Sequence, residues 1–282
     1  MKLIVAKKAG FCYGVKKAVE LAEKTYAENS EPIYSIGPLI HNRFEVQRLS
    51  KIGIKPVSSV NKVKKGTIII RTHGIPREYI LEARKKKLNV IDATCPFVKR
   101  VQHLVKELSK KNFYVLIIGE KEHPEVKSLI SYAEKPVKII ESINEIRGLS
   151  DGKKIAVVSQ TTQSLEKFNH IIKGIKSKYK NAKIFNTICT AALERQEEAE
   201  KIAREVDVVL IIGGRNSANT ARLVDICKKH TITYHIESAE EINDRWFDNV
   251  HSIGILAGAS TPKWIIDAVI SHMKGKDWLW KI

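Results

Sequence analysis

Residues 89–96 read Asn89-Val90-Ile91-Asp92-Ala93-Thr94-Cys95-Pro96. The β-branched pair Val90-Ile91 predicts a short strand, which small and polar residues then end. A cysteine and a proline follow, and the proline ring fixes the backbone just past the thiol. The stretch therefore predicts a strand that ends by presenting a cysteine sulfur.

Two of the other three cysteines are presented in the same way. Cys12 follows the apolar run 3–6, and Cys189 follows the run 184–188. Cys227 differs, because it stands at helical spacing from Leu223 and Val224 and so reads as part of an apolar helix face. We interpret three cysteines as chemically active and one as a core residue. Three unrelated buried cysteines are the alternative.

Composition is that of a globular protein: 282 residues, 43% hydrophobic and 28% charged. The first apolar run is too short for a signal peptide, and no later run approaches the about 18 residues of a membrane helix. We therefore expect a cytoplasmic protein without a membrane partner. In a reducing compartment, widely separated cysteines favour metal binding or catalysis over structural disulfides.

The chain is strongly basic, with 49 lysines and arginines against 31 aspartates and glutamates and a formal charge of +18. Such a charge favours anionic partners, of which an acidic redox protein and a phosphorylated substrate fit equally well. Solvated helix surfaces explain the basic runs as well. No zinc-finger or RNA-binding motif accompanies them, so nucleic acid is not favoured. A basic RNA-binding protein with core cysteines is kept as an alternative.

Strand-like runs alternate with amphipathic stretches, which predicts an α/β fold with mainly parallel sheets. We expect strands at 3–6, 67–70, 90–91, 114–118, 155–158, 184–188, 208–212 and 253–256. We expect helices at 15–26, 43–51, 76–87, 97–110, 165–178, 193–205 and 262–274. Polar signatures follow the carboxyl end of each strand, where open α/β sheets bind ligands.

Three small α/β lobes are expected, at residues 14–95, 96–187 and 188–282, with the N-terminal strand in residues 1–13 joining the last. A metal site whose ligands lie so far apart in sequence must lie where separate units meet. Three thiolates can hold a four-iron cluster by three irons and leave the fourth iron open to substrate. Zinc is a weaker candidate, because its usual paired cysteine or histidine spacing is absent.

Several polar residues at strand ends suit an anion. His41, His73 and His123 stand at comparable loop positions and together suggest a cationic or hydrogen-bonding pocket. The runs 216–219 and 260–262 open predicted helices, where their plain role is capping. The amide groups of a helix start also bind phosphate oxygens, so capping and phosphate binding coincide there.

Taken together, these motifs resemble the 4-hydroxy-3-methylbut-2-enyl diphosphate reductases, the last enzymes of the non-mevalonate isoprenoid pathway. The resemblance runs from residue 1 to about residue 271 and rests on the runs 11–15, 39–42, 72–74, 92–96, 119–125, 160–162, 188–189, 216–219 and 257–260. It implies three lobes in a trefoil around one 4Fe-4S cluster. It also implies reductive removal of the allylic hydroxyl from the substrate, giving isopentenyl and dimethylallyl diphosphate.

The resemblance also implies roles for single residues. Cys12, Cys95 and Cys189 match the cluster ligands, and Glu125 matches the proton donor. Thr161 matches the residue near the substrate hydroxyl. The residues that match the diphosphate pocket are His41, His73, His123, Ser217, Asn219 and Ser260.

One position departs from the pattern. Many members carry serine where this chain has Ala218, so a backbone amide would replace a hydroxyl contact to phosphate there. The implied partners are a small allylic diphosphate and an acidic ferredoxin- or flavodoxin-type electron donor. The nearest rival enzyme is a three-lobed iron-sulfur dehydratase that acts on carboxylates, such as quinolinate synthase.

Overall fold

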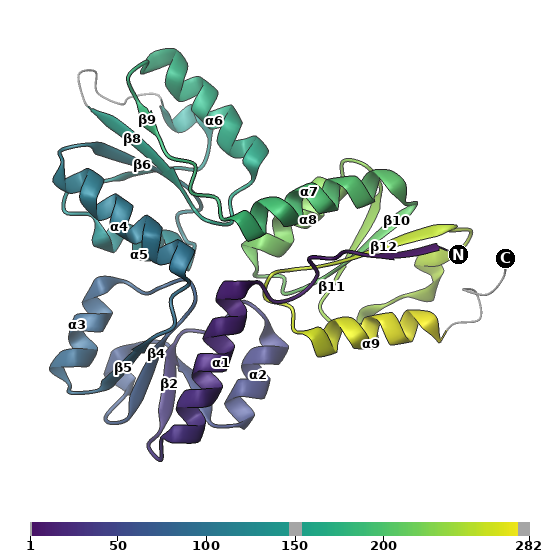
Figure 1. Ribbon diagram of the computed structural model, residues 1–282, viewed down its shortest axis with the longest axis horizontal. Coiled ribbons are helices and arrows are strands. Elements are labelled where there is room, and N and C mark those ends of the chain that lie inside the picture. Colours follow the sequence, from purple (N-terminus) through teal and green to yellow (C-terminus); the bar gives the residue numbers. More distant parts are fainter. Residues whose placement is uncertain (1, 147–153, 276–282) are drawn as a thin grey trace. The chain divides into compact units, whose positions relative to one another are not determined.

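The computed structural model describes residues 2–146 and 154–275. Within these residues the strands form three four-stranded sheets, and every paired strand is parallel to its neighbour. Helices flank each sheet (Figure 1). The predicted α/β class with parallel sheets is confirmed.

The first sheet has the strand order β3-β2-β4-β5. Its strands are β2 (Ile33–Ile36), β3 (Ile54–Val57), β4 (Thr67–Ile70) and β5 (Asn89–Asp92). The neighbouring helical segments are α1 (Tyr13–Glu28), α2 (Arg43–Lys51), η1 (Val60–Lys62) and α3 (Arg77–Lys85). Ile68 and Ile70 of the central strand pack with Ala83 of α3 in one buried cluster.

The second sheet repeats this order as β7-β6-β8-β9. Its strands are β6 (Tyr114–Ile118), β7 (Lys138–Ile140), β8 (Ile155–Ser159) and β9 (Lys183–Ile184). Its helical segments are α4 (Pro96–Lys110), α5 (Pro124–Tyr132), η2 (Ile143–Ile146) and α6 (Leu165–Lys178). Alternate residues of β6, Val115 and Ile117, pack with Val105 of α4 and Leu129 of α5, so these two helices cover one face.

The third sheet has the order β11-β10-β12-β1. Its strands are β1 (Lys2–Val5), β10 (Val208–Ile212), β11 (Ile232–Ile236) and β12 (Ser252–Ala257). Its helical segments are α7 (Thr190–Glu205), α8 (Ala218–Cys227), η3 (Ala239–Glu241), η4 (Asp244–Phe247) and α9 (Lys263–Lys274). Leu210 and Ile212 face α9, whereas Val209 and Ile211 face α7 and α8. A strand that is buried on both faces reads as a continuous apolar run.

A cysteine follows the fourth strand in all three sheets. Cys95 comes after β5, and Cys189 comes after β9. In the third sheet the fourth place belongs to β1, which pairs with β12 from the other end of the chain (Figure 1). Cys12 therefore follows an edge strand as well.

Contacts divide the chain into two compact units. One comprises Met1–Lys16, His41–Gln47 and Thr190–Ile282, and the other comprises Lys17–Ile40 and Arg48–Cys189. The three-lobe division at 14–95, 96–187 and 188–282, with residues 1–13 added to the last, stays a prediction.

Short strands account for most differences from the expected elements. The expected strands omit β2, β3, β7 and β11. The strand expected at 184–188 is wrong beyond Ile184, because local polar groups replace the regular ladder there. The Thr187 hydroxyl accepts from the Ser159 N–H at 2.7 Å, and the Asn186 side chain accepts from the Ile188 N–H at 3.1 Å. Among the described residues, no helix has the length and apolar character that crossing a membrane requires.

At Gly66, just before β4, the backbone passes close to the backbone of Pro32, and a substitution can test how much this approach matters to the first sheet. The φ of Gly66 is +110°, and an added Cβ would lie 2.2 Å from the Pro32 carbonyl oxygen. Because that oxygen is backbone, it cannot move aside cheaply. We expect Gly66→Ala to lower the free energy of unfolding by about 2 kcal/mol or more, measured by chemical denaturation. Gly275→Ala is the matched control, because its Cβ would meet nothing closer than 3.5 Å. An equal effect of both substitutions would contradict this account.

Candidate functional site

Each cysteine that follows an edge strand is anchored by its backbone. The N–H of Cys95 donates to the Thr72 carbonyl at 2.9 Å, that of Cys189 to the Thr161 carbonyl at 2.9 Å, and that of Cys12 to the Ala259 carbonyl at 3.0 Å. Each acceptor lies two residues past the end of the neighbouring strand. The parallel pairing thus continues past the strands and fixes the backbone at the thiol.

A helix begins directly after each of these cysteines. Cys95 is the N-cap of α4, Cys12 precedes α1 and Cys189 precedes α7. The amino end of a helix favours negative charge, and the thiolate is the form of cysteine that binds metals. All three side chains are partly exposed and outside any disulfide. This donor set fits a thiolate-ligated iron-sulfur cluster.

Cys227 has the opposite environment. It is fully buried in the cluster that α7 and α8 form on the third sheet. Burial raises the pKa of the Cys227 thiol to about 12, so the thiolate is strongly disfavoured. The interpretation of Cys227 as a core residue is confirmed.

Glu125 lies in the first turn of α5 and is 1% exposed. Its Oε1 accepts from the Thr161 N–H at 2.6 Å, and its Oε2 accepts from the Thr161 hydroxyl at 2.7 Å. Burial raises the pKa of Glu125 to about 7, although the two hydrogen bonds from Thr161 act in the opposite direction. A carboxyl group with this pKa can hold and release a proton near neutral pH.

His73 and His123 lie beside this acid in the same compact unit. Their rings meet edge to face with centroids 5.4 Å apart. The Nδ1 atom of His123 accepts from the Glu125 N–H at 3.2 Å, so in the neutral ring the proton lies on Nε2. The His123 ring can therefore present a donor to an anion even when it is uncharged.

The orientation of His73 follows from Thr72. The Thr72 hydroxyl donates to the Leu39 carbonyl at 3.1 Å and lies 3.3 Å from the His73 Nδ1. Because the single hydroxyl hydrogen goes to the carbonyl, the Thr72 oxygen accepts from His73, which places a proton on Nδ1. The His73 Nε2 atom donates only when the ring is protonated.

A second group of predicted residues gathers in the other unit. The His41 Nδ1 donates to the Asn216 carbonyl at 2.7 Å, and the Ser260 hydroxyl donates to the His41 carbonyl at 2.9 Å. Ser217 is the N-cap of α8 and accepts from the Thr220 N–H at 3.3 Å. The loops that carry His41, Ser217 and Ser260 are thus joined directly.

Asn219, in the first turn of α8, supplies the observation that points to an anion. Asn219 is 6% exposed, and its Nδ2 has no hydrogen-bond partner among the described residues. The Nδ2 of the buried Asn42, next to His41 in the sequence, also has no hydrogen-bond partner among the described residues. A buried donor without an acceptor is costly, and the oxygens of a phosphate group would supply acceptors. Ala218 begins α8, so its N–H is among the first-turn amides that lack an intrahelical acceptor.

Sequence reasoning missed two groups of buried polar residues. Arg195 of α7 is 6% exposed and donates to the carbonyls of Ala191 and Gly10 at 2.9 and 2.8 Å. It ties the start of the helix after Cys189 to the loop before Cys12. The sequence does hold a signal for this residue: Arg195 stands at helical spacing from Ala192 and Ala199, which places an arginine on the buried face of the helix.

Gln102 and Ser128 form the other missed group. The Gln102 side-chain amide donates to the Ser128 hydroxyl at 2.8 Å, and that hydroxyl donates to the Ile75 carbonyl at 3.1 Å. This chain of bonds fixes the turn after His73 against α4 and α5. Nothing in the local pattern distinguishes these two residues from surface polar groups.

Known proteins resemble the chain over almost its whole length. The LytB protein family matches residues 3–274. The 4-hydroxy-3-methylbut-2-enyl diphosphate reductases of Geobacter sulfurreducens and Geobacter metallireducens are each 45% identical to it over 98% of both chains.

Two solved structures agree with these matches. A structure of (E)-4-hydroxy-3-methyl-but-2-enyl diphosphate reductase, described as the terminal enzyme of the non-mevalonate pathway, has 45% identity and a TM-score of 0.74 and covers 98% of this chain and 100% of its own. The Plasmodium falciparum E-1-hydroxy-2-methyl-but-2-enyl-4-diphosphate reductase has 29% identity and a TM-score of 0.93 and covers 96% of this chain and 87% of its own. The resemblance inferred from the motifs is confirmed: the chain belongs to the LytB protein family.

Proposed function

We propose that this chain removes the allylic hydroxyl of 4-hydroxy-3-methylbut-2-enyl diphosphate reductively, with Glu125 as the proton donor, and releases isopentenyl and dimethylallyl diphosphate. The family and its reductase relatives support the reaction. The observation that supports the role of Glu125 is the burial of its carboxyl group against Thr161, which raises the pKa to about 7.

Cys12, Cys95 and Cys189 are the proposed ligands of one 4Fe-4S cluster. Their placement after edge strands and at helix starts supports this assignment. When bound, such a cluster supplies electrons and an iron that has no cysteine ligand. The chain's own task is to hold the three sulfurs, and the backbone hydrogen bond of each cysteine supports this role.

The histidines and the residues at the helix starts are proposed to bind the diphosphate. The proposed contacts come from His41, His73, His123, Ser217, Asn219 and Ser260. The unsatisfied amide of Asn219 and the Nε2–H of His123 are donors that a phosphate oxygen can accept from. Binding energy at the diphosphate then positions the allylic end for reaction.

Glu125 and Thr161 move the proton in this scheme. The Thr161 N–H can only donate to Oε1, which favours placing the acid proton of Glu125 on Oε2. The Thr161 hydroxyl then accepts from Oε2 and turns its own hydrogen toward the substrate hydroxyl. Protonation converts a poor leaving group into water, and two electrons from the external donor together with a second proton, which goes to carbon, complete the reduction.

The electron donor is proposed to be an acidic ferredoxin- or flavodoxin-type protein. The formal charge of +18 supports this choice, because opposite charge speeds diffusional encounter. A reducing compartment, the cytoplasm, suits a chain with three partly exposed thiols.

Serine substitutions test the cluster ligands. Serine is a poor iron ligand beside a thiolate, so Cys12→Ser, Cys95→Ser and Cys189→Ser should each lose most bound iron or activity. Cys227→Ser should keep both, because the Cys227 thiol is a core residue. Iron content and visible absorbance after anaerobic purification are the measurements. Loss of colour in Cys227→Ser, with colour kept in one of the others, would refute the assignment.

Glu125→Gln tests the proton donor. The amide keeps the size and hydrogen bonding of the acid but supplies no acidic proton, so turnover should fall at least about 100-fold. In the wild type the acid form is the active one, so kcat/KM should decline as pH rises through about 7. The variant should lack this decline.

Iron content and substrate affinity are the controls for this variant. Both should match the wild type, which shows that the fold and the binding loops are intact. Near-normal turnover with full iron content would remove Glu125 from the mechanism.

The salt dependence of turnover tests whether the electron donor is recognised through its charge. Between about 0.05 and 0.5 M salt, turnover with an acidic protein donor should slow markedly, because screening weakens steering. A small uncharged reductant is the control and should show much less change. Equal salt sensitivity with both reductants would count against electrostatic recognition.

A further inference from the structure

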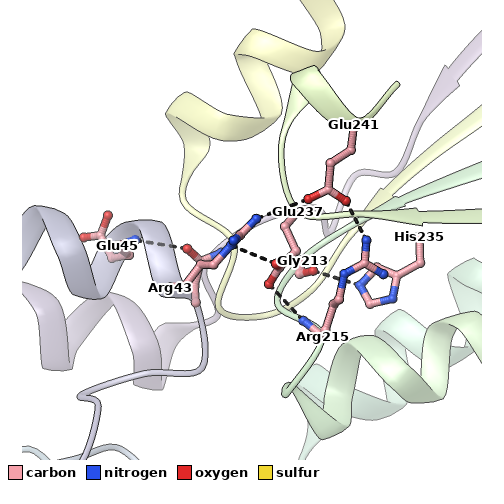
Figure 2. Close-up of polar contacts among 8 residues, drawn as sticks. Arg43, Glu45, Gly213, Arg215, His235, Glu237 and Glu241 are labelled. Atoms are coloured by element: carbon pink, nitrogen blue, oxygen red, sulfur yellow. Dashed lines mark hydrogen bonds and ion pairs between the residues drawn. The ribbon is translucent and has the colours of Figure 1, made fainter. Parts of the chain in front are cut away.

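Glu237 follows β11, and its buried carboxylate joins two loops. The residue is 7% exposed. Its Oε1 accepts from the Arg215 backbone N–H at 3.1 Å, and its Oε2 lies 2.8 Å from the Arg43 Nε (Figure 2). One side chain therefore links the loop after β10 to the first residue of α2.

A second carboxylate completes the group. Glu241 lies 3.3 Å from the Arg43 Nη2 and 2.6 Å from the Arg215 Nη2 (Figure 2). Within this group the Glu241 carboxylate contacts arginine side chains, whereas the Glu237 carboxylate also accepts from the backbone N–H of Arg215. Two arginines and two glutamates carry no net charge, so the group adds little to the attraction of an anion.

Both linked loops lead directly to the proposed diphosphate residues. Arg43 lies two residues after His41, and Arg215 lies two residues before Ser217. Between these points the His41 ring donates to the Asn216 carbonyl at 2.7 Å. A Cβ on Gly214 would lie 2.5 Å from the His41 carbonyl oxygen, so the two backbones are in close contact.

Each of the two segments is also held by a bond of its own. The His235 Nε2 lies 2.8 Å from the Gly213 carbonyl oxygen, so it donates there (Figure 2). The Asn42 side chain accepts from the Glu45 N–H at 3.1 Å and caps α2. Glu237 connects these two separately fixed segments, in addition to the His41–Asn216 bond and the contacts of Glu241, and it does so with a bond to backbone.

We propose that Glu237 is a positioning residue that sets the spacing between His41 and the start of α8 for a diphosphate group. This inference rests on the proposed function. Glu237 acts through Arg43 and the Arg215 backbone and does not itself touch the ligand.

Glu237→Gln separates positioning from charge, because the two explanations predict opposite results. Both partners of the carboxylate are N–H donors, so an amide can accept from only one of them and must oppose the other with its NH2 group. Positioning therefore predicts weaker diphosphate binding. Loss of a negative charge alone predicts tighter binding of an anion.

The measurements are KM and kcat with the allylic diphosphate, and calorimetric binding of inorganic pyrophosphate to the iron-loaded protein. We expect Glu237→Gln to raise KM and the pyrophosphate Kd at least about tenfold, with kcat within about threefold of the wild type. Glu241→Gln is the comparison variant: it makes the same charge change but removes side-chain contacts only and no backbone bond, so KM should change much less than in Glu237→Gln.

Arg43→Lys provides an independent test that does not require Glu237→Gln to fold. It keeps the charge, but one ammonium group cannot replace the two guanidinium contacts, so KM should rise again. An unchanged or lower KM in folded Glu237→Gln, or in Arg43→Lys, would overturn the proposal. A loss of kcat with unchanged KM would also overturn it. Failure of the wild type to reduce the substrate would refute the proposed function instead. The positioning role would still be tested in that case, because pyrophosphate binding is measured without turnover.

Discussion

The continuation of parallel strand pairing past the ends of the strands is the constraint on which the cysteine positions depend. In each sheet, a carbonyl two residues beyond one strand accepts from the backbone N–H of a cysteine beyond the edge strand. An edge strand has a free side, and in this fold its extension carries the cysteine. The helix that starts at once after each cysteine then adds a favourable electrostatic environment for a thiolate.

This constraint explains how the N-terminal strand takes part in a sheet made by the C-terminal third of the chain. The fourth strand of the third sheet is β1, and the chain just beyond it presents Cys12. The pairing of Lys2 with Ser252 through Val5 with Ile255 sets the register. A shift by one residue would exchange the two faces of the strand and move Cys12 away from its acceptor at Ala259.

Strong apolar runs made much of the fold predictable from the sequence. The strands at 67–70, 114–118 and 208–212 have the predicted bounds, because each is central and buried on both faces. The four omitted strands are weaker in pattern. Three of them are edge strands, and one edge strand contains Pro56, which an edge tolerates. The burial of Glu125 and the links made by Glu237 could not be read from local pattern, because both depend on residues more than 20 positions away.

Glu125 and Glu237 show how neighbours separate the roles of two buried carboxyl groups. Glu237 faces the Arg43 guanidinium and a backbone amide, so its negative charge is compensated and it can serve as a fixed link. In the part of the chain that the structure describes, the Glu125 carboxyl group accepts from the neutral donors of Thr161, and burial raises its pKa to about 7. A carboxyl group without a cation is suited to carry a proton, and one beside a cation is suited to hold a structure.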